Sequence, residues 1–280
     1  MPTCSHFSRA ANKWQRNFIR ALSGGAPGVL ARPHWSKQRH GRHMRFSNKL
    51  ALVAGGTGGL GHAVSLAFLQ EGAKVVVTYR QQKEFDALKS EGGANASLVD
   101  GHNVDVTDEI AVRGLIDQVV TAHGHIDVLV NTVGAYAGGV NLWELEPKIF
   151  DEMLALNLRS GYMLARATIP AMLKQKRGTI VNVAAKAALD HGAGASAYAA
   201  SKAGALALME SLAAEVKGSG VRVNTILPSI IDTEANRKAI PNADFAKWPK
   251  PADIARVILF LCSDEAKVIH GASLPVYGDS

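Results

Sequence analysis

Cysteine is nearly absent from this chain of 280 residues, which contains only Cys4 and Cys262. Two cysteines cannot build a disulfide framework, so we expect a reducing compartment, the cytoplasm in the simplest interpretation. Uninterrupted apolar runs of the ~18 residues that span a bilayer are also lacking. Glycines and His62 break the most apolar stretch, residues 50–69. The sequence therefore predicts no membrane-spanning helix and no membrane partner.

Acidic residues are absent from the first 43 positions. The basic residues there are Arg9, Lys13, Arg16, Arg20, Arg32, Lys37, Arg39 and Arg42. They account for the whole net charge of +7, so the rest is close to neutral and we expect it to bind no nucleic acid. We interpret residues 1–43 as a disordered extension outside the fold. A mitochondrial transit peptide is the first alternative, and a nucleic-acid-binding arm is a weaker one.

From Lys49 onward, short apolar runs alternate with segments of helix length. The predicted strands cover residues 50–54, 74–78, 126–131, 178–184, 221–227 and 272–276, with another near 97–99 or 103–106. The predicted helices cover residues 59–71, 83–91, 108–123, 147–173, 196–217 and 253–262. Wholly apolar strands joined by helices indicate a parallel sheet covered on both faces. We therefore predict an α/β fold for residues 44–280, a single Rossmann-type doubly wound sheet of about seven strands.

A glycine-rich turn, residues 55–61, joins the first predicted strand to the first predicted helix. Glycine lets the backbone turn tightly and approach a pyrophosphate, and a helix start offers free N–H groups. The alternative is a glycine-rich turn without a ligand. We expect a dinucleotide to bind here through Gly55, Thr57, Gly59, Leu60 and Gly61.

The second predicted strand ends at Thr78-Tyr79-Arg80, where an acid that holds the ribose hydroxyls of NAD is usual. No carboxylate is present, and Arg80 can instead pair with the 2′-phosphate of NADP. The pattern favours NADP(H) as the cofactor, with NAD(H) as the alternative. The simpler interpretation of Arg80 is an ordinary solvated arginine.

Tyr198 and Lys202 are four residues apart on a predicted helix, so they share one face. Hydride transfer to a C=O or C=N bond needs a proton for the developing anion. Tyrosine near its free pKa of ~10 is a poor acid–base group at neutral pH, and an adjacent ammonium lowers that pKa. We expect Tyr198 to be the acid–base group and Lys202 to lower its pKa. A packed tyrosine and a surface lysine are the alternative.

Six motifs stand in one order, each at a predicted strand or helix end. They are the glycine turn, Asp105-Val106, Asn131-Thr132-Val133-Gly134, Asn157, Tyr198-Ala-Ala-Ser-Lys202, and Pro228 with Thr233. Together they make residues 48–280 resemble the short-chain dehydrogenase/reductase family. Two positions depart from its pattern, since Ala54 stands where threonine is usual and Ser229 where glycine is usual.

The resemblance implies an NAD(P)-dependent oxidoreductase that acts on a small molecule, and we expect no metal site. It implies that Asn157 is a third catalytic residue, which helps to hold a proton-relay water. It further implies cofactor contacts from Asp105, Val106, Asn131, Gly134, Tyr198, Lys202, Pro228 and Thr233. Members commonly assemble through two long helices, so we expect a homodimer or homotetramer.

The family usually has a serine thirteen residues before the tyrosine, bonding the substrate carbonyl, but this chain has Ala185. Loss of such a donor should cost ordinary carbonyl reduction ~10²-fold or more. The quinonoid dihydropteridine reductase branch also lacks the serine, and residues 185–190 and 232–248 resemble it locally. Its substrate is an activated imine that needs less polarisation, so we predict this or another small carbonyl or imine. Two observations argue against a pterin substrate. The dihydropteridine reductase branch carries an acid where this chain has Tyr79-Arg80, and residues 271–278 resemble the common bacterial branch instead.

Two classes of function follow from these residues. The first is an active reductase, which intact Tyr198, Lys202 and Asn157 favour. The second is a catalytically weak cofactor-binding protein acting as a sensor or scaffold, which Ala185 permits.

Overall fold

The computed structural model describes residues 44–280, and the expectations for residues 1–43 lie outside this range. Parallel strands form one sheet in the order β3-β2-β1-β4-β5-β6-β7. They are β1 (Leu50–Ala54), β2 (Lys74–Tyr79), β3 (Val99–Asn103), β4 (Val128–Asn131), β5 (Gly178–Val183), β6 (Val221–Pro228) and β7 (Ser273–Val276). Strands β2 and β4 pair with opposite sides of β1, so the strand order reverses beside β1. This confirms the predicted doubly wound, Rossmann-type sheet.

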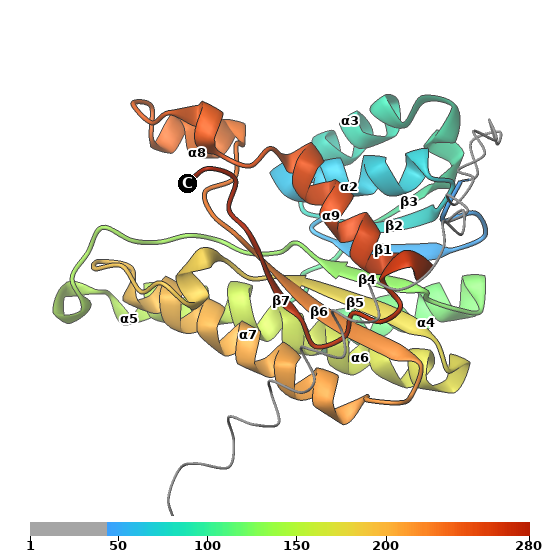
Figure 1. The fold of residues 1–280 in the computed structure, drawn as a ribbon. Helices are drawn as coiled ribbons and strands as arrows, with labels where there is room; N and C mark the ends of the chain where they lie inside the picture. The colour runs from blue at the N-terminus through green and yellow to red at the C-terminus, as the bar shows by residue number, and fades with distance from the viewer. Residues whose placement is uncertain (1–43) are drawn as a thin grey trace, which may run out of the picture. The chain divides into compact units, whose positions relative to one another are not determined.

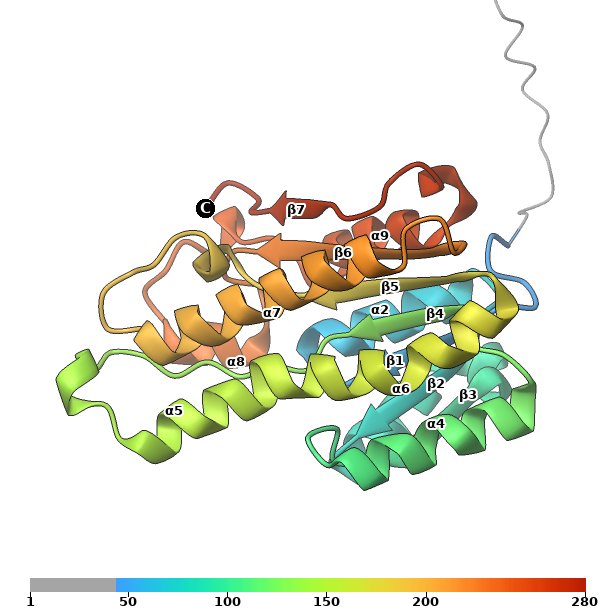
Figure 2. The same ribbon diagram turned by 90° about the horizontal axis from the view of Figure 1, so that it is seen from below.

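Helices cover both faces of the sheet (Figure 1). They are α2 (Gly59–Gln70), α3 (Gln82–Gly92), α4 (Glu109–His123), α5 (Pro147–Leu154), α6 (Ser160–Gln175), α7 (Ser196–Glu215), α8 (Glu234–Ala239) and α9 (Pro251–Cys262). Figure 2 shows α6 and α7 running side by side across one face. No helix within residues 44–280 is both long and apolar enough to cross a bilayer.

Alternate side chains of β1 enter two separate cores, as the two-residue period of a strand requires. Ala51 and Val53 join the core beneath α2 and α9. Leu50 and Leu52 join the core beneath α4, α6 and α7. All four side chains are fully buried, so β1 is fixed between the two helix layers. The glycine turn follows the last residue of β1 directly, so it lies at the carboxyl edge of the sheet.

Two local predictions need correction. The third strand spans Val99–Asn103, between the two predicted positions, because this segment, VDGHN, is mostly polar and only Val99 is buried. The single helix predicted over residues 147–173 is interrupted by a π-helical turn, η3 (Ala155–Arg159), between α5 and α6. Such turns often occur at functional sites, and this one carries Asn157.

Candidate functional site

The glycine turn leaves β1 in a conformation that side chains other than glycine rarely adopt. Gly55 has a φ of +71°, and a Cβ on Gly61 would lie 2.0 Å from the carbonyl oxygen of Gly55. No side chain caps α2, because its N-cap residue is Gly58. The N–H groups of the first turn of α2 therefore have no side-chain partner among the described residues. This cradle fits a pyrophosphate.

Hydroxyl groups fasten the turn to its surroundings. Thr132 donates a 2.7 Å hydrogen bond to the carbonyl oxygen of Ala54, and the N–H of Gly55 donates a 2.9 Å bond to Oγ1 of Thr78. Thr57 donates a 3.0 Å bond to Oε2 of Glu84 on α3. The sequence reasoning missed Glu84, which has no motif of its own and reaches the turn only through the fold.

Arg80 is exposed at the end of β2, close to Asp105 at the carboxyl end of β3. The N–H and hydroxyl of Thr107 donate hydrogen bonds to Asp105 and lower the pKa of its carboxyl, and the charge of Arg80 lowers it further. Val106 is buried in the core. The structure thus places Arg80 near Asp105. Among the described residues, none makes a hydrogen bond with the guanidinium of Arg80.

Tyr198 and Lys202 both lie on α7, but they point to different partners. The ring of Tyr198 packs edge-on against Tyr136, with centroids 4.9 Å apart. Lys202 is buried, and its Nζ donates a 3.1 Å hydrogen bond to the carbonyl oxygen of Val183. Its Nζ lies 6.0 Å from the centre of the Tyr198 ring.

These positions determine the pKa of each group. Burial raises the pKa of Tyr198 to about 12, and the neighbouring Tyr136 adds to the rise. Burial lowers the pKa of Lys202 to about 8. The prediction that Lys202 lowers the pKa of Tyr198 is therefore wrong for this structure, because desolvation dominates and the ammonium is directed to Val183.

Asn157 links the π-helical turn to α7 and to the loop after β4. Its Oδ1 accepts a 2.9 Å bond from the N–H of Ala135, and its Nδ2 donates to the carbonyl of Ala135 and to Oγ of Ser201, both at 3.0 Å. A Cβ on Gly134 would lie 2.8 Å from Oδ1 of Asn157 and 3.0 Å from Nζ of Lys202. Gly134 therefore lets the loop approach both side chains. Ser201 was not singled out from the sequence, although it stands inside the tyrosine–lysine motif.

Asn131 is buried at the end of β4 and connects this strand to β5. Its Nδ2 donates a 2.9 Å bond to Oδ1 of Asn182 on β5, and its Oδ1 accepts a 3.1 Å bond from the N–H of Val133. Only 2 % of Asn131 is exposed. These contacts hold the loop after β4 in place. Asn131 would therefore act on a ligand indirectly, by positioning that loop.

The segment after β6 closes over the glycine turn. A Cβ on Gly59 would lie 2.8 Å from Cγ2 of Thr233, so this threonine sits directly against the turn. Thr233 also caps α8, accepting a 3.2 Å bond from the N–H of Asn236. Pro228 ends β6. Ser229, which stands where glycine was expected, donates a 2.6 Å bond to the carbonyl of Tyr277.

Ala185 follows β5 and is 8 % exposed. It presents only a methyl group. Lys186, the next residue, does not replace the missing hydroxyl donor, because its Nζ lies over the ring of Tyr277, 5.2 Å from the ring centre. A hollow of about 390 Å³ is lined by Tyr136 and by seven residues between 137 and 149, mainly through apolar groups. Tyr136 thus contacts Tyr198 and also lines this hollow.

The family model described as short chain dehydrogenase matches residues 49–244. The chain is 32% identical over 243 residues to a 3-oxoacyl-[acyl-carrier-protein] reductase FabG of Thermotoga maritima, covering 84% of this chain and 98% of the relative. It is 36% identical over 250 residues to a D-threitol dehydrogenase of Mycolicibacterium smegmatis, covering 84% and 94%. A solved structure of ElxO with NADP bound has a TM-score of 0.78 at 27% identity, covering 82% and 97%.

Proposed function

Because this chain belongs to the short-chain dehydrogenase family, a family of oxidoreductases, we propose that it reduces an activated C=N or C=O bond of a small molecule with NADP(H). The observation that carries the proposal is the meeting of Tyr198, Lys202 and Asn157 at the sheet edge that bears the glycine turn. Ligands of doubly wound sheets bind at this edge.

The proposed cofactor site runs along the carboxyl ends of β1, β2 and β3. Gly55, Thr57, Gly59, Leu60 and Gly61 would hold the pyrophosphate, and the other predicted contacts would hold the rest of the dinucleotide. The exposed guanidinium of Arg80, to which no residue within 44–280 is hydrogen-bonded, supports NADP(H), as does the likeness to the NADP-bound structure of ElxO. NAD(H) is the alternative. The nicotinamide supplies the hydride when bound.

Tyr198 is the proposed proton donor. Its pKa of about 12 keeps the hydroxyl protonated at neutral pH, which suits the reductive direction. Lys202 is held by Val183 and lies beside Gly134, so it would bind the cofactor rather than the substrate. Asn157 positions the loop that carries Gly134 and Ala135.

Ala185 bears on the substrate class. Without a donor at this position, an ordinary ketone would be polarised by Tyr198 alone. A substrate that already accepts hydride readily, such as a quinonoid dihydropterin or another conjugated imine, needs less help. The relatives named above act on a 3-oxoacyl group and on threitol, so an activated carbonyl is the second candidate.

The test is oxidation of NADPH and of NADH with a quinonoid dihydropterin, a 3-oxoacyl thioester and a simple ketone. We expect turnover with NADPH and an activated substrate, and its loss in Tyr198→Phe with cofactor affinity retained. Tight NADPH binding without turnover of any substrate would instead favour the catalytically weak sensor or scaffold.

We also propose that the protein is a cytoplasmic homodimer or homotetramer assembled through α6 and α7. Exposed Tyr162 and Leu173 on α6 support this arrangement. Light scattering after gel filtration measures the mass directly. Residues 1–43 are proposed to be dispensable for folding, so a chain beginning at Met44 should retain the thermal midpoint and the activity. Localisation with and without this segment would identify a transit peptide.

A further inference from the structure

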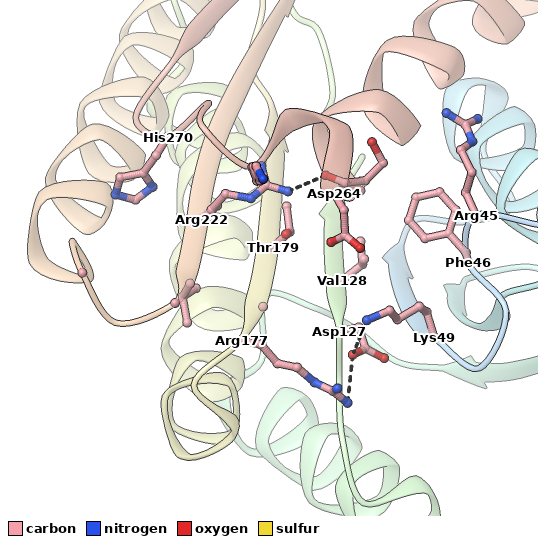
Figure 3. Close-up of a pocket in the computed structure, with 17 residues that line it drawn as sticks. Arg45, Phe46, Lys49, Asp127, Val128, Arg177, Thr179, Arg222, Asp264 and His270 are labelled. Carbon is pink, nitrogen blue, oxygen red and sulfur yellow. Dashed lines mark hydrogen bonds and ion pairs between the residues drawn. The ribbon is translucent and has the colours of Figure 1, made fainter.

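A second cavity, of about 410 Å³, opens at the amino ends of β4, β5 and β6 (Figure 3). Its lining includes the first residues of these strands, Val128, Gly178 and Val221. The proposed cofactor site lies at the carboxyl ends of the same parallel strands. The two sites are therefore at opposite edges of the sheet, and the cavity is not part of the proposed reductase site.

Basic side chains outnumber acidic ones around this cavity. The basic lining residues are Arg45, Lys49, Arg177, Arg222 and Lys267, and the acidic ones are Asp127 and Asp264. Asp127 is 6 % exposed and is shared by Lys49 at 3.8 Å, Arg177 at 3.3 Å and His125 at 3.2 Å. Arg45 pairs with Glu71 outside the lining at 3.0 Å. Asp127 is shared by two lining cations, so the lining keeps a positive excess, which a concave surface concentrates.

Arg222 is a cation held in place without a carboxylate partner. Its Nη1 donates a 3.2 Å bond to the carbonyl oxygen of Ile269, and its Nη2 donates a 3.1 Å bond to that of Ser263. No acidic group lies within ion-pair distance among residues 44–280. Burial lowers the pKa of Arg222, but an arginine remains charged in proteins. The carbonyls fix the guanidinium, and the charge of Asp264 in the same lining acts on it without forming an ion pair.

Two further donors in the lining have no partner within the described part of the chain. Thr179 is 6 % exposed, and its hydroxyl makes no hydrogen bond there. Lys267 has no carboxylate within 4.0 Å of its Nζ there. His270 is different, because Nδ1 accepts from the N–H of Val223 and Nε2 donates to the carbonyl of Ala213. Both ring nitrogens of His270 are therefore bonded, and the donors without a partner among the described residues are Thr179, Lys267 and the remaining N–H groups of Arg222.

We propose that this cavity is a second binding site, for a small oxyanion that carries two or more negative charges. Guanidinium and ammonium groups are donors only, so they select acceptors such as phosphate or carboxylate oxygens. The volume lies in the range of about 300–1,000 Å³ that is usual for small-molecule pockets. Arg222, Thr179 and Lys267 form the anion-binding group.

Isothermal titration calorimetry of the full-length chain with pyrophosphate and with citrate, at constant ionic strength, tests the proposal. Each titration is run with and without saturating NADPH, because pyrophosphate can also enter the glycine turn. The variants are Lys267→Glu and the isosteric Thr179→Val. Lys174→Glu is the matched control, since Lys174 is exposed and lies outside the lining.

We expect one site per chain that persists with NADPH. Its dissociation constant should rise at least tenfold in Lys267→Glu, about threefold or more in Thr179→Val, and stay unchanged in the control. Tighter pyrophosphate binding identifies a phosphate-bearing ligand, and tighter citrate binding identifies a carboxylate. Absence of binding, or equal affinity in the wild type and both cavity variants, would overturn the proposal. Neither result depends on whether the reductase activity exists.

Discussion

Asn157 donates a 3.0 Å hydrogen bond to Oγ of Ser201, and Ser201 in turn donates a 2.7 Å bond to the carbonyl oxygen of Tyr198. This chain of bonds connects the π-helical turn to the helix that carries the proposed proton donor. Asn157 also bonds both backbone groups of Ala135. One buried amide therefore sets the distance between three segments of the site.

Replacing Asn157 by alanine should destabilise the protein by roughly 1–3 kcal/mol, because it leaves the part-buried backbone groups of Ala135 and the buried hydroxyl of Ser201 without this partner. Urea unfolding measures the change. Asn141→Ala is the control, since Asn141 is exposed and bonds only Glu144. Its stability should stay within about 0.5 kcal/mol of the wild type. Equal stability of both variants would contradict the role given to Asn157.

The stability of the protein should depend on pH through Lys202. Its pKa falls from 10.5 to about 8 on folding, so between these values the unfolded chain holds a proton that the folded protein has lost. Stability therefore rises with pH across this window, by at most about 3 kcal/mol. Above pH 10 the contribution of Tyr198 makes stability fall as the pH rises. With a pKa of about 12, the folded protein keeps a proton on Tyr198 that the unfolded chain releases.

Urea unfolding of the wild type and Lys202→Met from pH 7 to pH 10 isolates the lysine contribution. The wild type should gain stability relative to the variant as the pH rises from 8 to 10. Lys174→Met, an exposed control on α6, should follow the wild type at every pH. Parallel curves for wild type and Lys202→Met would show that Lys202 is not desolvated.

The raised pKa of Tyr198 predicts an asymmetry between the two directions of reaction. Reduction uses the protonated tyrosine and should be insensitive to pH between about 6 and 8. Oxidation needs the phenolate and should accelerate with pH up to at least pH 10. Tyr198→Phe should lower the reduction rate by ~10²–10⁴-fold, as expected for loss of a general acid. Steady-state rates in both directions, with NADPH and NADP, provide the measurement.

The sheet and the glycine turn were predictable because apolar strands and glycine spacing are local patterns. The π-helical turn was not, because the contact that it carries, between Asn157 and Ala135, joins positions 22 residues apart in the sequence. Helical spacing correctly placed Tyr198 and Lys202 on one helix, but it could not show that Lys202 bonds Val183. The basic cavity had no motif either, since Thr179, Arg222 and Lys267 come from three separate segments.

Restoring a hydroxyl at position 185 tests the argument on substrate class. Ala185→Ser should raise kcat/KM for a simple ketone by about 10–100-fold, because it adds a donor for the developing oxyanion. It should change the value for an activated imine much less. Ala187→Ser, two residues further along the same segment, is the control. An equal effect on both substrates would remove the link between Ala185 and substrate activation.

Arg80 should determine the choice between the two nicotinamide cofactors. Its guanidinium is exposed at the end of β2, and Asp105 is the acid whose pKa it lowers. Arg80→Ala should weaken NADPH binding by about 10–100-fold through loss of a charge-assisted pair with the 2′-phosphate. NADH lacks this phosphate, so its affinity should change by less than about twofold. Fluorescence titration with each cofactor measures both constants, and Arg113→Ala, an exposed arginine on α4, is the control for net charge. A similar loss of affinity for both cofactors would mean that Arg80 stabilises this edge of the sheet and does not bind the 2′-phosphate.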